Sequence, residues 1–232
     1  MISKLDIMLF SKSLNRDIDV KVLVPMDEKN EFFETYDILY LFNGMLGSRH
    51  DWIDKSNLMH YLENKNLIVV MPDGENAFYL NYEDGRSYSN MITEDLPQYI
   101  EELLGLNLDH EKRHIAGLSM GGYGALYNGL RKSRMYRSIG AFSPAIPMHE
   151  PKEKIDRLPS LVNLIEDNSY NPFIFMGCGS KDFLIERNRY FIEYLKKENI
   201  KFEYFEEDYE HEWAFWDIAI RKYLEFIMKG EY

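Results

Sequence analysis

A serine flanked by glycines is the residue in this sequence best suited to form a covalent bond with a substrate. It lies in the pentapeptide Gly117-Leu118-Ser119-Met120-Gly121, after a strand-like run at 113–116 and before a helix-like segment at 122–128. A G-x-S-x-G pattern between a strand and a helix is typical of a nucleophile elbow, a sharp turn that exposes the serine hydroxyl. The turn needs glycines because Cβ atoms at the flanking positions would collide with the neighbouring strand and helix. The pattern predicts Ser119 as the nucleophile of an acyl-transfer reaction.

The same glycines also fit a different function. Gly117, Gly121 and Gly124 match the dinucleotide-binding turn of short-chain dehydrogenases, in which backbone amides face a pyrophosphate. That turn follows the first strand of its fold, whereas this one lies at mid-chain. Those enzymes also need a downstream Tyr-x-x-x-Lys, and the pair with that spacing here, Tyr61 and Lys65, lies upstream. The order of the motifs therefore excludes the dehydrogenase interpretation.

A serine hydroxyl needs a base to take its proton, and two histidines follow Ser119 in the chain. His149 lies in a proline-rich stretch, ahead of every good candidate for the acid that would orient the base. His211 lies in a short loop after the strand-like run at 202–205 and before the last predicted helix. A lone histidine in a loop is usually a solvated side chain. Its place after the last strand nevertheless predicts His211 as the base.

The acid that would orient this base is sought between the serine and the histidine. Asp182 falls in the turn after the apolar run at 173–177, at the carboxyl end of a predicted strand, where such folds place active-site groups. By itself an aspartate here would be interpreted as the cap of a helix that begins near Phe183 or Leu184. Together with Ser119 and His211 in the required order, the position predicts a catalytic Asp182.

The negatively charged oxygen of a tetrahedral intermediate needs two amide donors. One is expected from the residue after the nucleophile, Met120. The other is expected from the loop that follows the strand-like run at 38–42, where glycines let the backbone turn its amides toward the site. We predict Met45 as this second donor, with Leu46 as the fallback. The alternative is that the glycines of this loop only make a turn from strand to helix.

Short apolar runs that recur along the chain indicate the elements that position these groups. They lie at 20–24, 38–42, 67–71, 115–116, 138–142, 173–176 and 202–205. The interior runs are almost continuously apolar, as in strands buried on both faces of a parallel sheet, whereas the first run alternates and suits an antiparallel edge strand. Helical patterns lie between them at 94–104, 184–198 and 213–228. The alternation predicts an α/β fold with a mostly parallel central sheet and helices on both faces.

The length of 232 residues favours a single domain that spans residues 1–232. The stretch at 144–172 breaks the rhythm of strands and helices, because it contains several prolines and only short apolar clusters. A loop-rich excursion of this size is either a lid over a site or a plain surface insertion.

Charge and cysteine content exclude several partners. The formal net charge of −12 argues against nucleic acid and against an anionic membrane surface, both of which need a basic face. The single cysteine, Cys178, can form neither an internal disulfide nor a thiolate metal cluster, and suits a reducing compartment. We interpret it as a small buried apolar residue. Lys4 and Asp6 interrupt the first residues, so the sequence predicts no signal peptide and a cytoplasmic protein. No residues are predicted to bind a metal.

Four motifs together resemble the esterase D-related α/β-hydrolases, and most closely their small bacterial tributyrin and acetyl esterases. They are the elbow with the Gly-Tyr-Gly-Ala that follows it at 117–125, Asn43-Gly44-Met45-Leu46-Gly47 followed by Trp52, Met71-Pro72-Asp73-Gly74 running into Phe78-Tyr79, and His211-Glu212-Trp213. The similarity runs from about residue 20 to the C-terminus. It implies an α/β-hydrolase fold and a serine esterase without a cofactor, with Ser119, Asp182 and His211 as its triad.

The first loop differs from the usual family pattern. Relatives often have His-Gly where this chain has Asn43-Gly44, a departure that falls in the loop expected to form part of the oxyanion hole. The S-formylglutathione hydrolases usually have Ser-Gly-Leu-Thr-Cys in this loop, and its absence here ranks that substrate lower.

The function expected from the residues and the resemblance is hydrolysis of short-chain acyl esters through an acyl-enzyme intermediate. A thioesterase, an S-formylglutathione hydrolase or an acyltransferase on the same triad stays open, as does a non-catalytic binding module. A small-molecule ester is the expected partner, and the sequence leaves a homo-oligomer open. Trp52, Phe78, Tyr79 and Trp213 are candidate walls of the acyl pocket; aromatic residues are often core instead, so we expect about half of them to line it.

Overall fold

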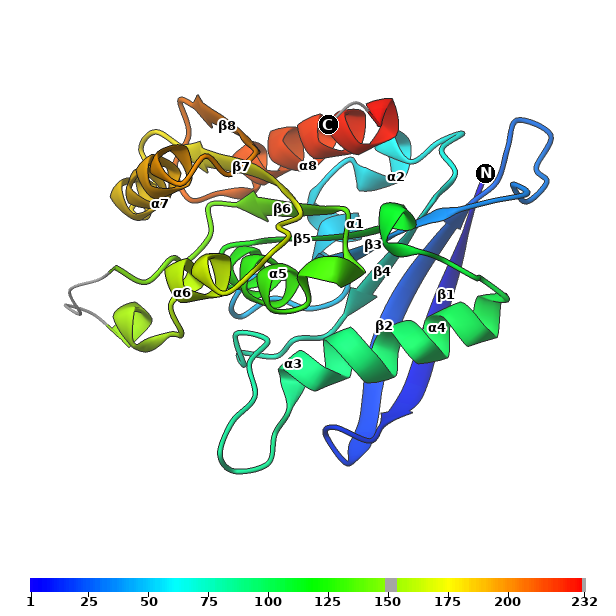
Figure 1. Cartoon of the computed structure of the whole chain (residues 1–232). Coiled ribbons are helices and arrows are strands. Elements are labelled where there is room, and N and C mark those ends of the chain that lie inside the picture. The colour runs from blue at the N-terminus through cyan, green and yellow to red at the C-terminus, as the bar shows by residue number, and fades with distance from the viewer. Residues whose placement is uncertain (149–153, 231–232) are drawn as a thin grey trace.

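Eight strands form one twisted sheet at the centre of the molecule (Figure 1). The computed structural model describes residues 1–148 and 154–230. In sequence the strands are β1 (Ile2–Ser11), β2 (Arg16–Pro25), β3 (Asp37–Phe42), β4 (Leu67–Pro72), β5 (Arg113–Leu118), β6 (Ser138–Phe142), β7 (Phe173–Gly179) and β8 (Phe202–Glu207). Their order across the sheet is β1-β2-β4-β3-β5-β6-β7-β8. Every apolar run predicted as a strand is part of one of them.

Six neighbouring strands, from β4 to β8 across the sheet, run parallel to one another. The central strands β4 and β6 are buried at every residue, as their continuous apolarity predicts. Because the carboxyl ends of parallel strands meet at one edge of a sheet, the segments that follow β3, β5, β7 and β8 are brought together there. This edge is where the candidate site forms.

The amino-terminal edge of the sheet differs from the prediction. The alternating run at 20–24 lies in β2, which is antiparallel to both neighbours but is not the edge strand. β1 takes the edge and pairs with β2 over its whole length. The charged Lys4 and Asp6 interrupt the apolar residues of β1, which hides it from a search for apolar runs. Exposed charges of this kind are common on edge strands.

Helices cover both faces of the sheet, as predicted. The α-helices are α1 (Asp51–Lys55), α2 (Leu58–Tyr61), α3 (Tyr88–Asn90), α4 (Leu96–Leu104), α5 (Met120–Arg131), α6 (Leu161–Glu166), α7 (Ile185–Lys197) and α8 (Trp213–Lys229). A π-helical turn at Met91–Asp95 precedes α4, and short 3₁₀ turns lie at His110–Lys112, Ser133–Met135 and Lys154–Arg157. One apolar core joins α4, α5, α6 and α7 to one face of the sheet, and a second joins α1, α2 and α8 to the other. None of the helices in the described part of the chain is both long and apolar enough to cross a bilayer.

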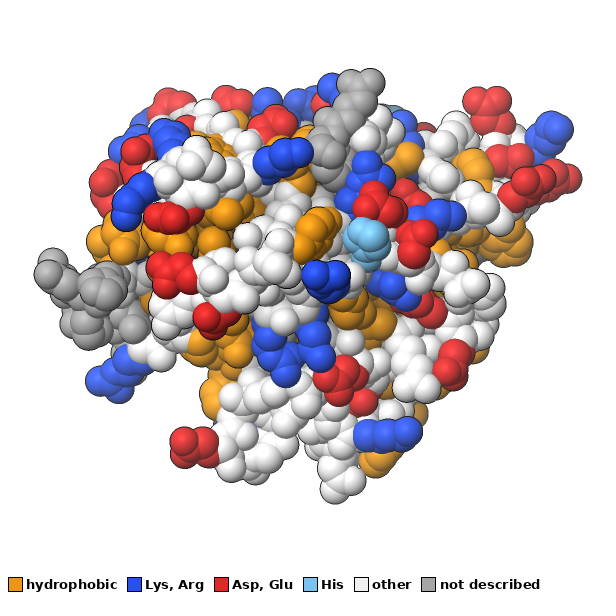
Figure 2. Space-filling view, in the orientation of Figure 1, with side chains coloured by type: hydrophobic (Ala, Val, Ile, Leu, Met, Phe, Trp, Pro, Cys, Tyr) orange, Lys and Arg blue, Asp and Glu red, His pale blue; other side chains and the backbone are white. Residues whose placement is uncertain are grey.

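The proline-rich stretch at 144–172 contains the 3₁₀ turn at Lys154–Arg157 and α6, which packs against α5. Residues 149–153 lie outside the described residues. Figure 2 shows apolar side chains gathered near α6 and α7, whereas acidic and basic side chains are interspersed over the rest of this face. A lid function for 144–172 stays a prediction.

Candidate active site

Ser119 occupies the sharp turn between β5 and α5. Its φ of 52° and ψ of −115° lie in a region that side-chain-bearing residues rarely adopt. A Cβ at Gly117 would lie 2.5 Å from the backbone of Gly121, and a Cβ at Gly121 would lie 2.5 Å from the carbonyl oxygen of Asn43. The glycines of the pentapeptide are therefore needed for the steric reason that the sequence suggested.

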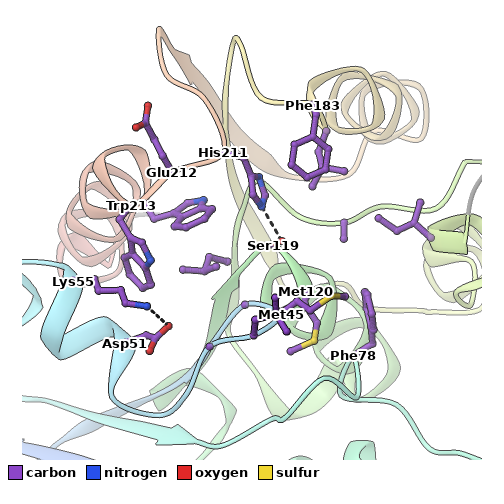
Figure 3. A pocket seen from close by; sticks show the side chains of 18 residues that line it. Met45, Asp51, Lys55, Phe78, Ser119, Met120, Phe183, His211, Glu212 and Trp213 are labelled. Atoms are coloured by element: carbon purple, nitrogen blue, oxygen red, sulfur yellow. Dashed lines mark hydrogen bonds and ion pairs between the residues drawn. The ribbon is translucent and has the colours of Figure 1, made fainter.

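His211 joins the other two predicted side chains in one hydrogen-bonded chain. Figure 3 shows the part of it between His211 and Ser119. Its Nδ1 lies 2.7 Å from Oδ2 of Asp182, and its Nε2 lies 3.0 Å from Oγ of Ser119. An ionised carboxylate can only accept a hydrogen bond, so Nδ1 donates its proton to Asp182. Nε2 is then left as the acceptor for the serine hydroxyl, which is the arrangement that a general base requires.

Asp182 is buried, with 2% of its surface exposed, and each carboxylate oxygen has its own partner. Oδ2 faces His211, while Oδ1 accepts a hydrogen bond of 2.8 Å from the backbone N–H of Leu184, just before α7. Burial by itself raises the pKa of Asp182, but the hydrogen bonds from His211 and Leu184 outweigh it, and the net pKa lies below the ordinary value. The carboxylate therefore both supports the start of a helix and orients the imidazole.

Two aromatic rings that the sequence analysis did not single out contact the imidazole of His211. The ring of Phe183 lies 4.7 Å from it, and the ring of Trp216 lies 4.9 Å away, almost perpendicular to it. Phe183 follows Asp182 directly, and Trp216 lies in the first turn of α8. The sequence signal that could have identified them is their position, because Phe183 is next to Asp182 and Trp216 follows His211 by five residues. The two rings pack against the imidazole from different elements of the chain.

The loop after β3 and the start of α5 bring two backbone amides to the candidate site. Met45 and Met120 both line the cavity that contains Ser119. Within residues 1–148 and 154–230, the N–H groups of Met45 and Met120 have no hydrogen-bond acceptor. The N–H of Leu46 instead donates a hydrogen bond of 2.8 Å to Oδ1 of Asn76. Leu46, the predicted fallback donor, is therefore already occupied, and Met45 is the one of the two predicted donors in this loop whose N–H has no acceptor among the described residues.

The cavity around Ser119 has a volume of about 720 Å³. Phe78 and Trp213, two of the four aromatic residues predicted to form its walls, line it. The other lining residues are Gly44, Met45, Leu46, Gly47, Asp51, Lys55, Leu118, Met120, Ala145, Ile155, Phe183, Leu184, His211, Glu212 and Trp216. Figure 3 shows Phe78 on one side of the serine and Trp213 on the other, with the ion pair of Asp51 and Lys55, 2.9 Å long, beyond Trp213. One end of the cavity is thus apolar and the other charged.

Trp52 and Tyr79, the other two predicted walls, lie in the core instead. Nε1 of Trp52 donates a hydrogen bond of 3.0 Å to the carbonyl of Phe42. The hydroxyl of Tyr79 donates one of 2.8 Å to Oδ1 of Asn43, and its ring stacks on Phe42 with centroids 4.3 Å apart. The prediction was wrong for these two residues because each polar atom finds a partner inside the protein, so the aromatic ring can be buried completely.

Cys178 is fully buried on β7, close to Asp182. Burial raises the pKa of its thiol far above the ordinary value, so the sulfur stays protonated and is a poor nucleophile. This agrees with the interpretation of Cys178 as a small apolar residue. Among the described residues, no group of three or more His, Cys, Asp and Glu side chains is arranged to hold a metal ion.

Comparison with protein families matches residues 11–227 to a family described as "Putative esterase". The match covers almost the whole chain. The chain belongs to this esterase family. The resemblance found in the sequence motifs is thereby confirmed.

Individual relatives of this esterase agree with the assignment. An acetyl esterase of Caldicellulosiruptor saccharolyticus is 28% identical over an alignment 260 residues long. The alignment covers 97% of this chain and 98% of the relative. A solved ferulic acid esterase is 28% identical, covers 100% of this chain and 99% of its own, and superposes with a TM-score of 0.85. A fluorophosphonate-binding serine hydrolase of Staphylococcus aureus is 21% identical, covers 97% of this chain and 98% of its own, and has a TM-score of 0.85. The esterase has an α/β-hydrolase fold and is a carboxylic ester hydrolase.

Proposed function

We propose that this esterase hydrolyses short-chain acyl esters, acetyl and butyryl esters among them, with Ser119, His211 and Asp182 as its catalytic triad. The observation that carries the proposal is the unbroken chain of hydrogen bonds from Asp182 through His211 to Ser119, which ends in a cavity. The similarity to an acetyl esterase along nearly the whole chain supports the choice of a small acyl group.

In the proposed first step, Nε2 of His211 takes the proton of Ser119 while Oγ attacks the carbonyl carbon of the ester. The backbone N–H groups of Met120 and Met45 stabilise the negative charge that develops on the carbonyl oxygen. His211 then gives its proton to the departing alcohol, and an acyl group stays bound to Ser119.

In the second step, water enters and His211 takes one of its protons. The hydroxide oxygen attacks the acyl carbon, Ser119 leaves and regains its proton from His211, and the acid is released. Asp182 stays ionised throughout and stabilises the imidazolium that forms twice in the cycle. Every proton in this scheme moves between groups of the chain, the ester and water.

We assign the apolar end of the cavity, with Phe78, to the acyl group. Trp213 and the charged end with Asp51 and Lys55 are assigned to the alcohol, which His211 must reach to protonate it. A short acyl chain and a polar alcohol match these two ends.

The test is labelling by a fluorophosphonate combined with a substrate panel. Wild-type protein should be labelled, and Ser119→Ala should lose both the label and at least about 10³-fold of the hydrolysis rate. Nitrophenyl acetate and butyrate should be cleaved faster than the octanoate ester. Faster turnover of formylglutathione would make the protein a thioesterase, and folded wild-type protein without label or hydrolysis would make it a binding module.

A further inference from the structure

The side chains of Asn43 and Asn76 hold two successive peptide groups of the loop after β3. The first group joins Gly44 to Met45. Its carbonyl, on Gly44, accepts hydrogen bonds from Nδ2 of Asn43 at 2.9 Å and from the N–H of Gly47 at 3.2 Å. In a planar trans peptide the N–H points opposite to the carbonyl. Fixing the carbonyl of Gly44 therefore also fixes the direction of the Met45 N–H.

The second peptide group joins Met45 to Leu46 and is held by Asn76, in the segment that follows β4. Its N–H, on Leu46, donates to Oδ1 of Asn76 at 2.8 Å. Leu46 has a φ of 62°, which is unfavourable for a residue with a Cβ, and the residue is 88% exposed. Because the side chain gains little from packing, hydrogen bonds must hold this backbone conformation. The bond from the Gly47 N–H to the Gly44 carbonyl closes the turn around Met45 and Leu46, and the bond to Asn76 is its side-chain support.

Both asparagines are tied to the segment at 73–79 that follows β4. Asn43 is buried, and its Oδ1 accepts hydrogen bonds from the hydroxyl of Tyr79 at 2.8 Å and from the N–H of Gly74 at 3.2 Å. Asn76 belongs to the same segment and is exposed. The segment thus holds the loop after β3 at two places, through the hydrogen bonds to buried Asn43 and through the bond from exposed Asn76 to Leu46.

We propose that Asn76 is a positioning residue for the oxyanion hole, acting together with Asn43 to aim the Met45 N–H at the reacting carbonyl oxygen. Neither asparagine touches the substrate in this scheme. The inference rests on the proposed function, because it needs Met45 to be an oxyanion donor. Since the negative oxygen exists only in the transition state, loss of the positioning lowers the rate of acylation rather than the affinity for the ester.

The experiment compares three variants. Asn76→Ala removes the acceptor for the Leu46 N–H, Asn76→Asp keeps an oxygen acceptor at the same reach, and Asn107→Ala removes an exposed asparagine outside the cavity. Asn76→Ala should lower the acylation rate constant for nitrophenyl acetate by about 10- to 100-fold. It should weaken a trifluoromethyl ketone, which forms a tetrahedral adduct with the serine, by a similar factor. Asn76→Asp and Asn107→Ala should stay within about threefold of wild type.

A purely structural role of Asn76 would lower the melting temperature without this parallel loss of rate and inhibitor affinity. The inference is overturned if Asn76→Ala keeps the wild-type acylation rate and inhibitor constant, or if Asn76→Asp falls as far as Asn76→Ala. Asn76→Leu, which is similar in size and has no acceptor, serves if the alanine variant does not fold, and wild-type kinetics there would overturn the inference equally. Wild-type protein that is not labelled by fluorophosphonate, by contrast, refutes the proposed function itself.

Discussion

Asp182 shows how one side chain can satisfy both interpretations that the sequence allowed. Its Oδ1 accepts from the Leu184 N–H, as a helix-capping aspartate would, and its Oδ2 accepts from His211. The two uses do not compete because a carboxylate has lone pairs on both oxygens. The residue is thus structural and, in the proposed mechanism, catalytic at once.

The two uses can be separated with Asp182→Asn. Its carbonyl oxygen can still accept from Leu184, but its amide donates toward Nδ1 of His211 and forces the proton onto Nε2. The imidazole can then no longer accept the proton of Ser119. We expect kcat/KM for nitrophenyl acetate to fall about 10³- to 10⁴-fold, with a much smaller change in melting temperature.

The matched control is Asp208→Asn, because Asp208 is an exposed aspartate whose recorded ion pair is with Lys181. It should leave both kcat/KM and melting temperature close to wild type. An Asp182→Asn variant with near wild-type activity would show that another group orients the base.

At the scale of elements, the site depends on turns at the carboxyl ends of the parallel strands. In the turn between β5 and α5, Ser119 is held at a positive φ, with Gly117 and Gly121 two residues away on either side. Gly117 packs against the backbone of Gly121, and backbone cannot move aside as a flexible side chain can. The direction of α5, and with it the Met120 N–H, depends on this close approach.

Gly117→Ala therefore tests the elbow as a structural unit. The added Cβ would lie 2.5 Å from Gly121, so the turn must open. We expect the free energy of unfolding to fall by about 2–3 kcal/mol. We also expect no fluorophosphonate labelling on the time scale on which wild type is labelled. Urea denaturation and labelling kinetics measure the two effects.

Gly105→Ala is its control at the end of α4. Gly105 also has a positive φ, of 65°, but a Cβ there meets nothing within 4 Å. It should cost about 1 kcal/mol of stability and leave labelling unchanged. Equal effects of the two substitutions on labelling would mean that the crowding at Gly117 does not matter.

At the scale of the whole molecule, stability depends on a buried histidine outside the site. His114 on β5 is 1% exposed, and its Nδ1 lies 2.8 Å from the hydroxyl of Ser138, which also lies 2.8 Å from the hydroxyl of Tyr223. Burial, aided by the charge of Arg137, lowers the pKa of His114 to about 3. The folded protein therefore keeps this histidine neutral well into acid.

The unfolded chain binds a proton at His114 near the ordinary pKa of about 6.5, whereas the folded chain does so only near 3. The free energy of unfolding is therefore unaffected by protonation of this histidine above about pH 6.5, and it decreases as the pH falls from there toward 3. The lowered pKa of Asp182 acts in the same direction, because its stabilisation is lost when the carboxylate is protonated. The molecule as a whole should be sensitive to acid.

Replacement of the imidazole with a ring that does not titrate, in His114→Phe, isolates the contribution of this residue. Ser138 lies 2.8 Å from the hydroxyl of Tyr223, so we expect its hydroxyl to keep a partner in the variant. We expect wild type to lose about 3 kcal/mol of unfolding free energy relative to His114→Phe between pH 7 and pH 4. Urea denaturation at several pH values measures this difference, and parallel pH curves for the two proteins would refute it.

Much of the fold and the site could be predicted because their signals are local. The continuous apolarity of strands such as β4 and β6, and the glycines around Ser119, are properties of a few neighbouring residues. The order of Ser119, Asp182 and His211 along the chain was enough to predict that they lie together, because parallel strands bring their carboxyl ends to one edge of the sheet. Substrate choice, assembly state and cellular location stay predictions.

Tertiary structure alone decided which residue meets which across long separations in sequence. Alternation in β2 showed an antiparallel strand but not that β1 would lie outside it. Phe78 and Tyr79 are neighbours of the same type, yet one lines the cavity and the other is buried on Phe42. The bond between Leu46 and Asn76 likewise joins loops that follow different strands. Local pattern determines what a segment can form, whereas packing geometry selects the partner, because burial and hydrogen bonds depend on distances that the linear chain does not contain.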